Sequence, residues 1–344
     1  MYRTIARPAG RIHATLTSLG LRVADEMNVR RAIREQRRLF SVVVRNQAGE
    51  RFFFKARLQA DPWLSRSLRH EAAVLRGLND RALHLHFAFP HLVADGHDGA
   101  FNWIIREFWD ADFSGEMNDT FGMTTSFLKR VPAARLAHAV ADIGQLPRHF
   151  NSDAPTVRHG KSWYLGDLEH YEHNVFPAFY GSPLNTYGFT QKMFSIFRRR
   201  FQTNKAFNRL VFSHGDLYPN NIFLNHNKQL SINDWDFSNL NLPTFDASMV
   251  SLHAWRSPVW VRQFARRFSV GHRGLRPSWL ASHTSLSIRL TGYAIVRLLN
   301  VEGERYPQPT PHERRELILL LRSHATTLKH LLEQPNKILM TLAS

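Results

Sequence analysis

Residues 214–236 read HGDLYPNNIFLNHNKQLSINDWD. Asp216 is followed five residues later by Asn221, and two short apolar segments then flank a turn-forming sequence at residues 225–228. This pattern predicts a β-hairpin, and Asp234 stands just after its second strand. The stretch therefore brings three oxygen-bearing side chains into one loop and the hairpin that follows it.

Magnesium-dependent phosphoryl transfer needs side chains of these types. One carboxylate must orient the attacking hydroxyl group and accept its proton. Hard oxygen ligands must hold Mg²⁺ against the phosphates of the nucleotide, and a cation must fix the rest of the phosphate tail. Asp216 is the candidate for the first role, and Asn221 and Asp234 are the candidates for the second.

The helix that begins near Asp61 carries an acidic residue on its apolar face. Four leucines between residues 64 and 78 are spaced four, seven and three residues apart, and Glu71 fills the vacant position in that series. A carboxylate that faces inward is costly unless it has a partner. Lys55, at the end of the preceding strand, is the candidate partner. The alternative is a glutamate at the edge of the apolar face that reaches water.

The order of the predicted elements indicates an α+β fold. Strands separated by turn sequences are predicted before the helix, at residues 41–45 and 50–56, and after it, at residues 92–94 and 101–108. Helical patterns dominate from there on, over residues 124–150, 187–210 and 244–340, the last including Arg314–Leu332. A small antiparallel sheet with one inserted helix therefore precedes a mostly helical part.

The motifs together resemble the phosphotransferase family that includes the aminoglycoside and choline kinases. His-Gly-Asp-x-x-x-x-Asn is followed by a hairpin and by Ile-x-Asp-Trp-Asp, and residues 243–247 read PTFDA, similar to the segment that follows the metal-binding aspartate in that family. Lys55 and Glu71 stand in the matching order upstream. The motifs span about residues 40–250. The resemblance implies a two-lobed, protein-kinase-like fold.

On this basis we expect three parts. Residues 1–19 form a basic leader, residues 20–108 an N-lobe that grips the nucleotide, and residues 109–344 a helical C-lobe with the catalytic loop and the metal-binding hairpin. The first 24 residues contain four arginines and no acidic residue. A transit peptide has a similar composition, but a basic leader is the simpler interpretation.

The resemblance also implies an activity and the roles of its residues. The chain is expected to be an ATP- and Mg²⁺-dependent phosphotransferase, a kinase that moves the γ-phosphate to a hydroxyl group of a small molecule; GTP is a second possible donor. Asp216 would act as the catalytic base, and Asn221 and Asp234 as Mg²⁺ ligands. Lys55 would contact the α- and β-phosphates and be held by Glu71.

Three further residues of the motifs are expected to have supporting roles. His214 is interpreted as a residue that fixes the catalytic loop, and Asp236 and Asp246 as residues with structural or substrate-side roles. The aromatic-rich segment 163–180 is interpreted either as the lining of an acceptor pocket or as core of the helical part.

The chain departs from the family at two places. No glycine occurs between residues 21 and 40, where a loop covers the phosphates in the family, and the basic segment Asn28–Arg38 stands there instead. Two interpretations of this segment stay open. Its arginines or backbone amides would hold the phosphates of the nucleotide, or the segment would make no contact with the nucleotide. Asn233 also occupies a position where an apolar residue is usual. The first departure leaves open a non-catalytic, kinase-like binding or regulatory protein.

Charge and composition bear on the binding partners, the acceptor and the location of the protein. The chain of 344 residues has 45 basic and 28 acidic residues, a net charge of +17, which would attract nucleic acid, an anionic membrane surface or phosphorylated substrates. The first two partners are not favoured, because the arginines are scattered along the chain. An anionic sugar or cell-envelope glycan competes with a cationic small molecule as the acceptor. The absence of cysteine excludes thiolate chemistry, and no apolar run is long enough to span a membrane, so a cytoplasmic location is expected.

Overall fold

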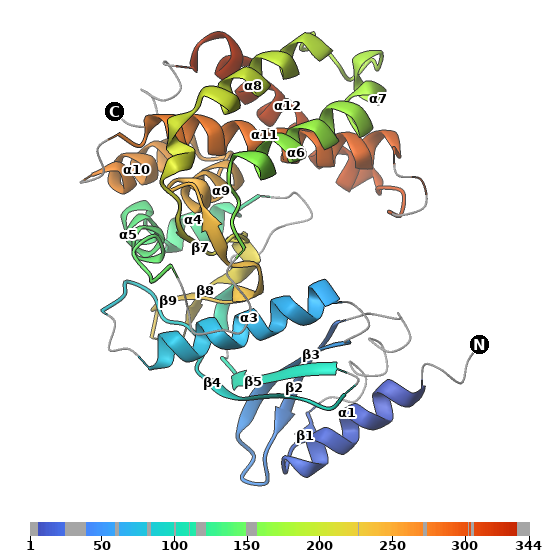
Figure 1. Cartoon of the computed structure of the whole chain (residues 1–344), viewed down its shortest axis with the longest axis vertical. Helices are drawn as coiled ribbons and strands as arrows, with labels where there is room; N and C mark the ends of the chain where they lie inside the picture. Colours follow the sequence, from blue (N-terminus) through green and yellow to red (C-terminus); the bar gives the residue numbers. More distant parts are fainter. Residues whose placement is uncertain are drawn as a thin grey trace. The chain divides into compact units, whose positions relative to one another are not determined.

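The computed structural model describes the residues 6–24, 39–58, 62–80, 84–99, 101–109, 111–114, 122–148, 157–225, 227–270, 274–301, 303 and 306–335. These residues form two compact units that are interleaved along the chain (Figure 1). The first unit comprises Met1–Asp112, His149–Thr156 and Asn225–Ser238. The second unit comprises Phe113–Arg148, Val157–Leu224 and Asn239–Ser344.

The first unit is built on a five-stranded antiparallel sheet with the strand order β1-β2-β3-β5-β4. Its strands are rich in the β-branched and aromatic residues that favour a pleated, half-buried surface. The elements of this unit are α1 (Ala6–Ser18), β1 (Arg22–Val23), β2 (Leu39–Arg45), β3 (Arg51–Leu58), α3 (Pro62–Asn79), β4 (Leu92–His97), β5 (Phe101–Glu107), β9 (Leu230–Ile232) and the short 3₁₀ turn η4 (Trp235–Phe237).

The two faces of this sheet differ because side chains alternate along each strand. One face is apolar and packs with α1, whose Ile12 and Leu16 join Phe54, Trp103 and other buried residues in one core. The opposite face packs with α3. Lys55 and Arg57 alternate with core residues of β3, so both lie on the α3 face.

Helix α3 places a carboxylate against that face. It begins at Pro62, a residue suited to the first helical turn because it has no N–H group to satisfy. Leu68, Leu75 and Leu78 are fully buried, and Glu71 between them is buried to the same degree. The inward position predicted for Glu71 is confirmed, and the alternative in which it reaches water is wrong. The side chain of the fourth leucine, Leu64, lies outside the described residues.

The second unit is mostly helical. Its helices are α4 (Thr125–Arg130), α5 (Ala133–Ile143), α6 (Lys161–Asn174), α7 (Pro177–Tyr180), α8 (Gln191–Thr203), α9 (Phe245–His253), α10 (Pro258–Ser269), α11 (Arg276–Leu299) and α12 (Pro311–Glu333), with 3₁₀ turns η2 (Lys205–Asn208) and η3 (Pro219–Asn221). The short strands β7 (Val211–Ser213) and β10 (Asn239–Asn241) pair antiparallel. Two more short strands are β6 (Ala111–Ser114) and β8 (Ile222–Asn225). Each of them contains residues of both units, because a boundary between the units falls within it.

Helix α11 forms the centre of the second unit and packs against α6, α9 and α12. Gly292 allows α6 to come close, because a Cβ atom at this position would lie 2.3 Å from a ring carbon of Tyr171. In the aromatic-rich segment, Tyr164, Phe176 and Phe179 are fully buried. Half of the aromatic residues of this segment are therefore core, and Trp163, Tyr171 and Tyr180 are half-buried.

The fold class predicted from the sequence is confirmed: a small antiparallel sheet with one helix on its face, and a mostly helical remainder. The predicted division at residues 19 and 108 remains a proposal. Within the expected leader, α1 is a helix whose apolar face is part of the first unit's core. The basic segment 28–38 lies outside the described residues. In the described part of the chain, no helix is both long and apolar enough to cross a membrane.

Candidate active site

The loop that carries Asp216 is anchored by a buried carboxylate of the second unit. Asp246, in the first turn of α9, accepts hydrogen bonds from the Ser213 hydroxyl at 2.9 Å and from the backbone N–H groups of His214 and Gly215 at 2.8 and 3.1 Å. Gly215 has φ of +78°, a conformation that glycine adopts without strain. Asp246 thus fixes the backbone at the turn from which Asp216 projects, a structural role as expected.

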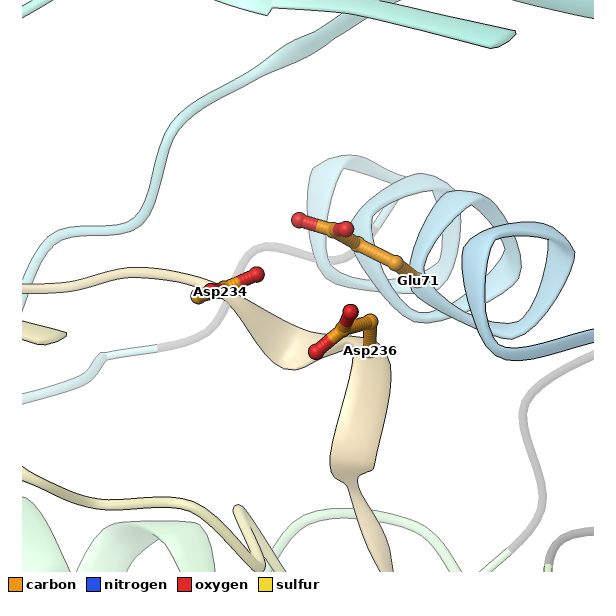
Figure 2. A group of neighbouring side chains, drawn as sticks. All are labelled: Glu71, Asp234 and Asp236. Carbon is orange, nitrogen blue, oxygen red and sulfur yellow. The ribbon is translucent and has the colours of Figure 1, made fainter. Parts of the chain in front are cut away.

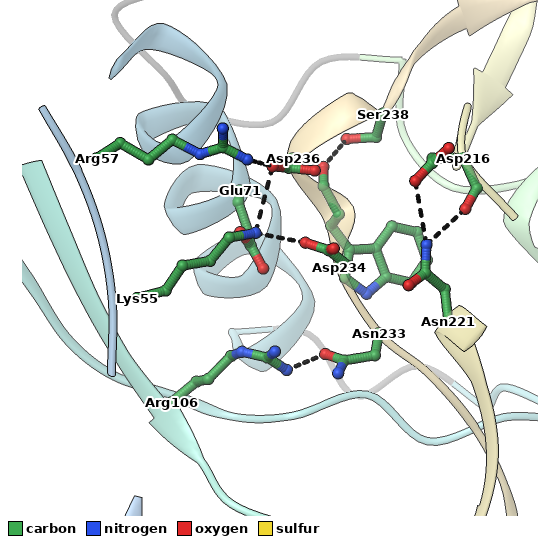
Figure 3. Close-up of polar contacts among 11 residues, drawn as sticks. Lys55, Arg57, Glu71, Arg106, Asp216, Asn221, Asn233, Asp234, Asp236 and Ser238 are labelled. Atoms are coloured by element: carbon green, nitrogen blue, oxygen red, sulfur yellow. Dashed lines mark hydrogen bonds and ion pairs between the residues drawn. The ribbon is translucent and has the colours of Figure 1, made fainter. Parts of the chain in front are cut away.

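Asp216 and Asn221 are brought together within this loop (Figure 3). The Nδ2 atom of Asn221 donates to the backbone carbonyl of Asp216 at 2.7 Å and to its carboxylate at 3.2 Å. The N–H of Asp216 also approaches the Nδ1 atom of His214 at 3.4 Å. The loop-fixing position expected for His214 is therefore what the structure shows.

The first unit gathers a second set of charged residues around Lys55 (Figure 3). The Lys55 ammonium lies 2.8 Å from Glu71 Oε2 and 3.2 Å from Asp236 Oδ2, and it also bonds directly to the Asp234 carboxylate. Lys55 is 3% exposed, so this ammonium is held almost entirely by protein carboxylates. The pairing of Lys55 with Glu71 that the sequence predicted is confirmed.

Electrostatics show how strongly these groups depend on one another. Burial alone lowers the pKa of Lys55, but the charges of Glu71, Asp234 and Asp236 outweigh it and raise the pKa above its ordinary value, so Lys55 stays protonated. Burial raises the pKa of Asp236 to about 7, against the opposing effects of Lys55 and Arg57. Asp236 is therefore protonated more readily than an exposed carboxylate.

Two arginines complete this charge cluster, and sequence reasoning missed both. The guanidinium of Arg57 bonds to the Asp236 carboxylate, and that of Arg106, on β5, bonds to the side chain of Asn233. Arg57 is detectable in the sequence, since it follows Lys55 by two residues and so shares its face of β3. This bond explains why a polar residue, Asn233, stands before Asp234 where an apolar one is usual: Asn233 is the partner of a buried arginine.

The Asp-Trp-Asp segment is fastened to the first unit at several points. Ala88 pairs with β9, donating to the Leu230 carbonyl at 2.7 Å and accepting from the Ile232 N–H at 2.9 Å. The Ser238 hydroxyl donates to the Trp235 carbonyl at 2.7 Å, so the Nε2 atom of His70, 2.9 Å away on α3, is its donor. These contacts hold the segment beside Lys55.

Asp234 itself adopts a left-handed backbone conformation, with φ of 67° and ψ of 64°. Aspartate tolerates this region better than most residues, but the conformation is still strained. Such strain persists only where neighbouring contacts fix the backbone, and it is common at functional sites.

Each unit has side-chain oxygens of the kind that bind divalent cations. In the second unit, Asn221 uses its Nδ2 atom on Asp216, and its amide oxygen has no hydrogen bond within the described part of the chain. Glu71 Oε1 and Asp236 Oδ1 are buried without a hydrogen-bond partner among the described residues. One carboxylate oxygen from each of Glu71, Asp234 and Asp236 lies within 4.8 Å of the others (Figure 2). Oxygen donors of these types are the ones that Mg²⁺ prefers.

One protein family matches part of the chain, and several solved structures share its fold. The phosphotransferase enzyme family matches residues 183–278, which contain Asp216, Asn221, Asp234 and Asp246. No curated protein sequence matches the chain. A choline/ethanolamine kinase family protein from Mesorhizobium loti has a similar structure, with a TM-score of 0.53 and 14% identity over 88% of this chain and 89% of the other.

Two further solved structures share the fold. The GDP complex of an aminoglycoside 2'-phosphotransferase-IIIa variant has a TM-score of 0.54 and 17% identity over 83% of this chain and 88% of the other. Amicoumacin kinase, solved with AMP-PNP, Ca²⁺ and its ligand, has a TM-score of 0.55 and 12% identity over 83% of this chain and 86% of the other. At these identities the similarity shows the fold alone. The resemblance predicted from the sequence is confirmed: residues 183–278 match the phosphotransferase enzyme family, and the fold is that of choline kinase and aminoglycoside phosphotransferase structures.

Proposed function

We propose that the chain is a kinase that transfers the γ-phosphate of ATP, with Mg²⁺, to a hydroxyl group of a small molecule. The observation that carries this proposal is the catalytic-loop geometry: a half-buried carboxylate, Asp216, is bonded to the amide of Asn221 on a loop that Asp246 anchors. The family match to this segment supports it, as do the AMP-PNP and GDP bound in structures of the same fold. A cytoplasmic location, where ATP is available, is part of the proposal.

Each residue has a distinct task in the proposed reaction. Asp216 accepts a hydrogen bond from the acceptor hydroxyl and takes its proton, while the acceptor oxygen bonds to the γ-phosphorus and the bond from that phosphorus to the leaving ADP oxygen breaks. Asn221 and Asp234 hold the metal ion through their side-chain oxygens. Lys55, held by Glu71, binds the α- and β-phosphates. Mg²⁺, when bound, neutralises charge on the phosphates.

Kinetics of two aspartate variants test these assignments. Asp216→Asn keeps the size of the side chain but removes the base, so turnover measured as ADP release should fall by about 10²- to 10⁴-fold. Its affinity for Mg-ATP should stay within about threefold of the wild type, because positioning of the nucleotide does not depend on the base. Asp234→Ala should instead weaken Mg-ATP binding by more than about tenfold, since it removes a metal ligand.

The matched control is Asp95→Asn, which removes an exposed carboxylate that pairs with Arg76 on the surface of the first unit. It should leave turnover and nucleotide affinity unchanged. Full turnover in Asp216→Asn would reject the base assignment. Mg-ATP binding without turnover of any hydroxylated compound would favour the non-catalytic, kinase-like alternative. Preference for GTP over ATP would change the donor and leave the residue roles as they are.

A further inference from the structure

In the second unit, an arginine of α11 is held in a fixed orientation by α6. The Cζ atom of Arg289 lies 4.3 Å from the centre of the Trp163 ring. Its Nε and Nη2 atoms donate to the two carboxylate oxygens of Asp167 at 2.9 and 3.0 Å. The ring contact and the two parallel bonds orient the guanidinium plane. Its Nη1 atom has no hydrogen bond with the described residues, and the side chain is 30% exposed.

Two aromatic rings connect this arginine to the residue that anchors the catalytic loop. Trp163 packs edge to face against Phe245, with ring centres 6.4 Å apart, and the next residue, Asp246, anchors the loop. Burial raises the pKa of Tyr218, on the same loop, to about 12, so its hydroxyl stays protonated. Its hydroxyl makes no hydrogen bond with the described part of the chain.

The aromatic surface around the arginine is larger than one ring. The His159 ring stacks on Trp163, with centres 3.9 Å apart and planes inclined by 5°. Burial and the charge of Arg289 lower the pKa of His159 to about 4, so His159 is neutral at physiological pH. His159 and Arg289 thus cover the two faces of the Trp163 ring, and rings and an oriented cation stand together, the combination that small-molecule sites use.

A polycationic acceptor fits these surroundings poorly. It would need carboxylates available beside Trp163 and Arg289, but Asp167 is taken up by Arg289 and by the Ser285 hydroxyl at 3.4 Å. Glu172, on the same helix, is paired with Arg198. The exposed edge of the oriented Arg289 guanidinium offers N–H donors instead, and N–H donors of arginine match the oxygens of carboxylates and phosphates.

We infer that Trp163 and Arg289, with Asp167 as a positioning residue, form an acceptor subsite that binds the oxyanion, a carboxylate or a phosphate, of a hydroxylated acceptor. This inference rests on the proposed function and deepens it, because it selects an anionic acceptor class over a cationic one. Arg289 contributes binding and specificity, while Asp216 contributes the chemistry on the hydroxyl group.

A panel of small probes tests the inference on the full chain. Glucuronate and glucose 1-phosphate are the anionic probes, methyl glucoside is the neutral one, and kanamycin and choline are the cationic ones. Binding is measured by calorimetry in the presence of Mg-AMP-PNP, and turnover as ADP release with Mg-ATP. At least one anionic probe should bind and be phosphorylated, with an affinity about tenfold or more above that of methyl glucoside.

Variants connect the preference to Arg289. Arg289→Met should raise KM for the anionic probe by about ten- to a hundredfold while kcat changes by less than about threefold, because the interaction serves binding. Asp167→Asn should raise KM by a smaller factor than Arg289→Met does. Asp167→Glu keeps the carboxylate, so its KM should lie between those of Asp167→Asn and the wild type. Arg198→Met is the matched control, since it removes another arginine–carboxylate pair of α6 and should leave KM unchanged.

Two results would overturn the inference: no binding of either anionic probe, or a preference for kanamycin or choline. If Arg289→Met fails to fold, Arg289→Lys gives the decisive value. Lysine keeps the charge but lacks the planar fork, so KM should still rise by about tenfold, and an unchanged KM would contradict the subsite. The proposed function survives any of these failures as long as Mg-ATP binds and another acceptor is phosphorylated. It fails separately if the nucleotide does not bind.

Discussion

Replacing Lys55 with methionine removes the cation to which three carboxylates of the first unit are bonded. The ammonium lies 2.8 Å from Glu71 and 3.2 Å from Asp236, and it contacts Asp234 directly. Methionine has a similar volume, so the change is mainly one of charge. Removing one partner from a buried ion pair costs about 3–5 kcal/mol, and we expect the free energy of unfolding to fall by about 4 kcal/mol at pH 8.

This loss should depend on pH because Asp236 can take up a proton. Burial raises its pKa to about 7 although Lys55 and Arg57 oppose the shift, so removal of Lys55 raises it further. A carboxyl whose pKa is raised in the folded state binds more protons there than in the unfolded chain, and its contribution to stability is lost as pH rises. Above pH 7 the folded variant keeps this proton, whereas the folded wild type has lost it. For each pH unit over which this difference holds, the stability of the variant relative to the wild type changes by about 1.4 kcal/mol. The wild type also loses part of this contribution between pH 6 and pH 8, so the loss caused by the substitution should be about 1 kcal/mol smaller at pH 6 than at pH 8.

Urea unfolding of the nucleotide-free protein at pH 6 and pH 8 measures both quantities. Arg76→Met is the control in the same unit, because Arg76 and Asp95 form an exposed pair whose loss should cost about 0–1 kcal/mol at either pH. A loss below about 1 kcal/mol at pH 8 for Lys55→Met, or an equal loss at both pH values, would show that these charges do not form a buried, mutually dependent cluster.

Three further predictions concern the second unit. Asp246→Asn should lower the free energy of unfolding by about 2–3 kcal/mol and reduce turnover, because the carboxylate accepts three hydrogen bonds from the catalytic loop; urea unfolding and ADP release check this. His324 is fully buried with both ring nitrogens unpartnered among the described residues, and burial lowers its pKa to about 3. Its unfolded form binds a proton below about pH 6.5, so stability falls as pH falls, and His324→Leu should reduce this slope by about 1.4 kcal/mol per pH unit between pH 6 and 4; equal slopes in urea titrations would contradict it. Gly292→Ala should destabilise by about 1–3 kcal/mol through contact with Tyr171, whereas Gly166→Ala on α6, where the added methyl group meets nothing, should not; thermal melting of both variants decides.

The pairing of Lys55 and Glu71 was predictable because each residue breaks a pattern. Glu71 interrupts a series of leucines on the apolar face of a helix, and such a carboxylate needs a buried partner. Lys55 was expected at the end of the strand that precedes this helix; it lies within β3, which continues to Leu58. A local pattern and a solvation cost were thus enough to predict a contact across 16 residues, which the structure places at 2.8 Å. The roles of the two residues toward a nucleotide remain proposals.

Contacts between distant segments were less accessible. Arg106 and Asn233 are bonded across 127 residues, and no periodicity of either segment points to the other. The partnership of Arg289 with Trp163 and Asp167 depends likewise on how α6 and α11 pack, which their sequences do not specify. Motif spacing predicts residues on one loop, whereas tertiary packing decides which side chains surround that loop.

Helix α1 shows another limit. Its basic composition favoured a leader in the sequence, but Ile12 and Leu16 recur four residues apart and pack into the core of the first unit. An amphipathic helix can combine a charged surface with a narrow apolar stripe. The amino-acid composition of such a helix reflects its many charged residues and does not reveal the few apolar residues that reach the core.

The most direct test of the account is the thermal melting of the wild-type protein with ATP and with GTP, each in the presence and absence of Mg²⁺. Binding to the folded state stabilises by mass action, about 2.7 kcal/mol at a ligand concentration a hundred times Kd. The proposed kinase should show a magnesium-dependent rise in Tm with ATP that is lost in Asp234→Ala and kept in Asp216→Asn. A protein that melts cooperatively and shows no rise with either nucleotide would contradict it.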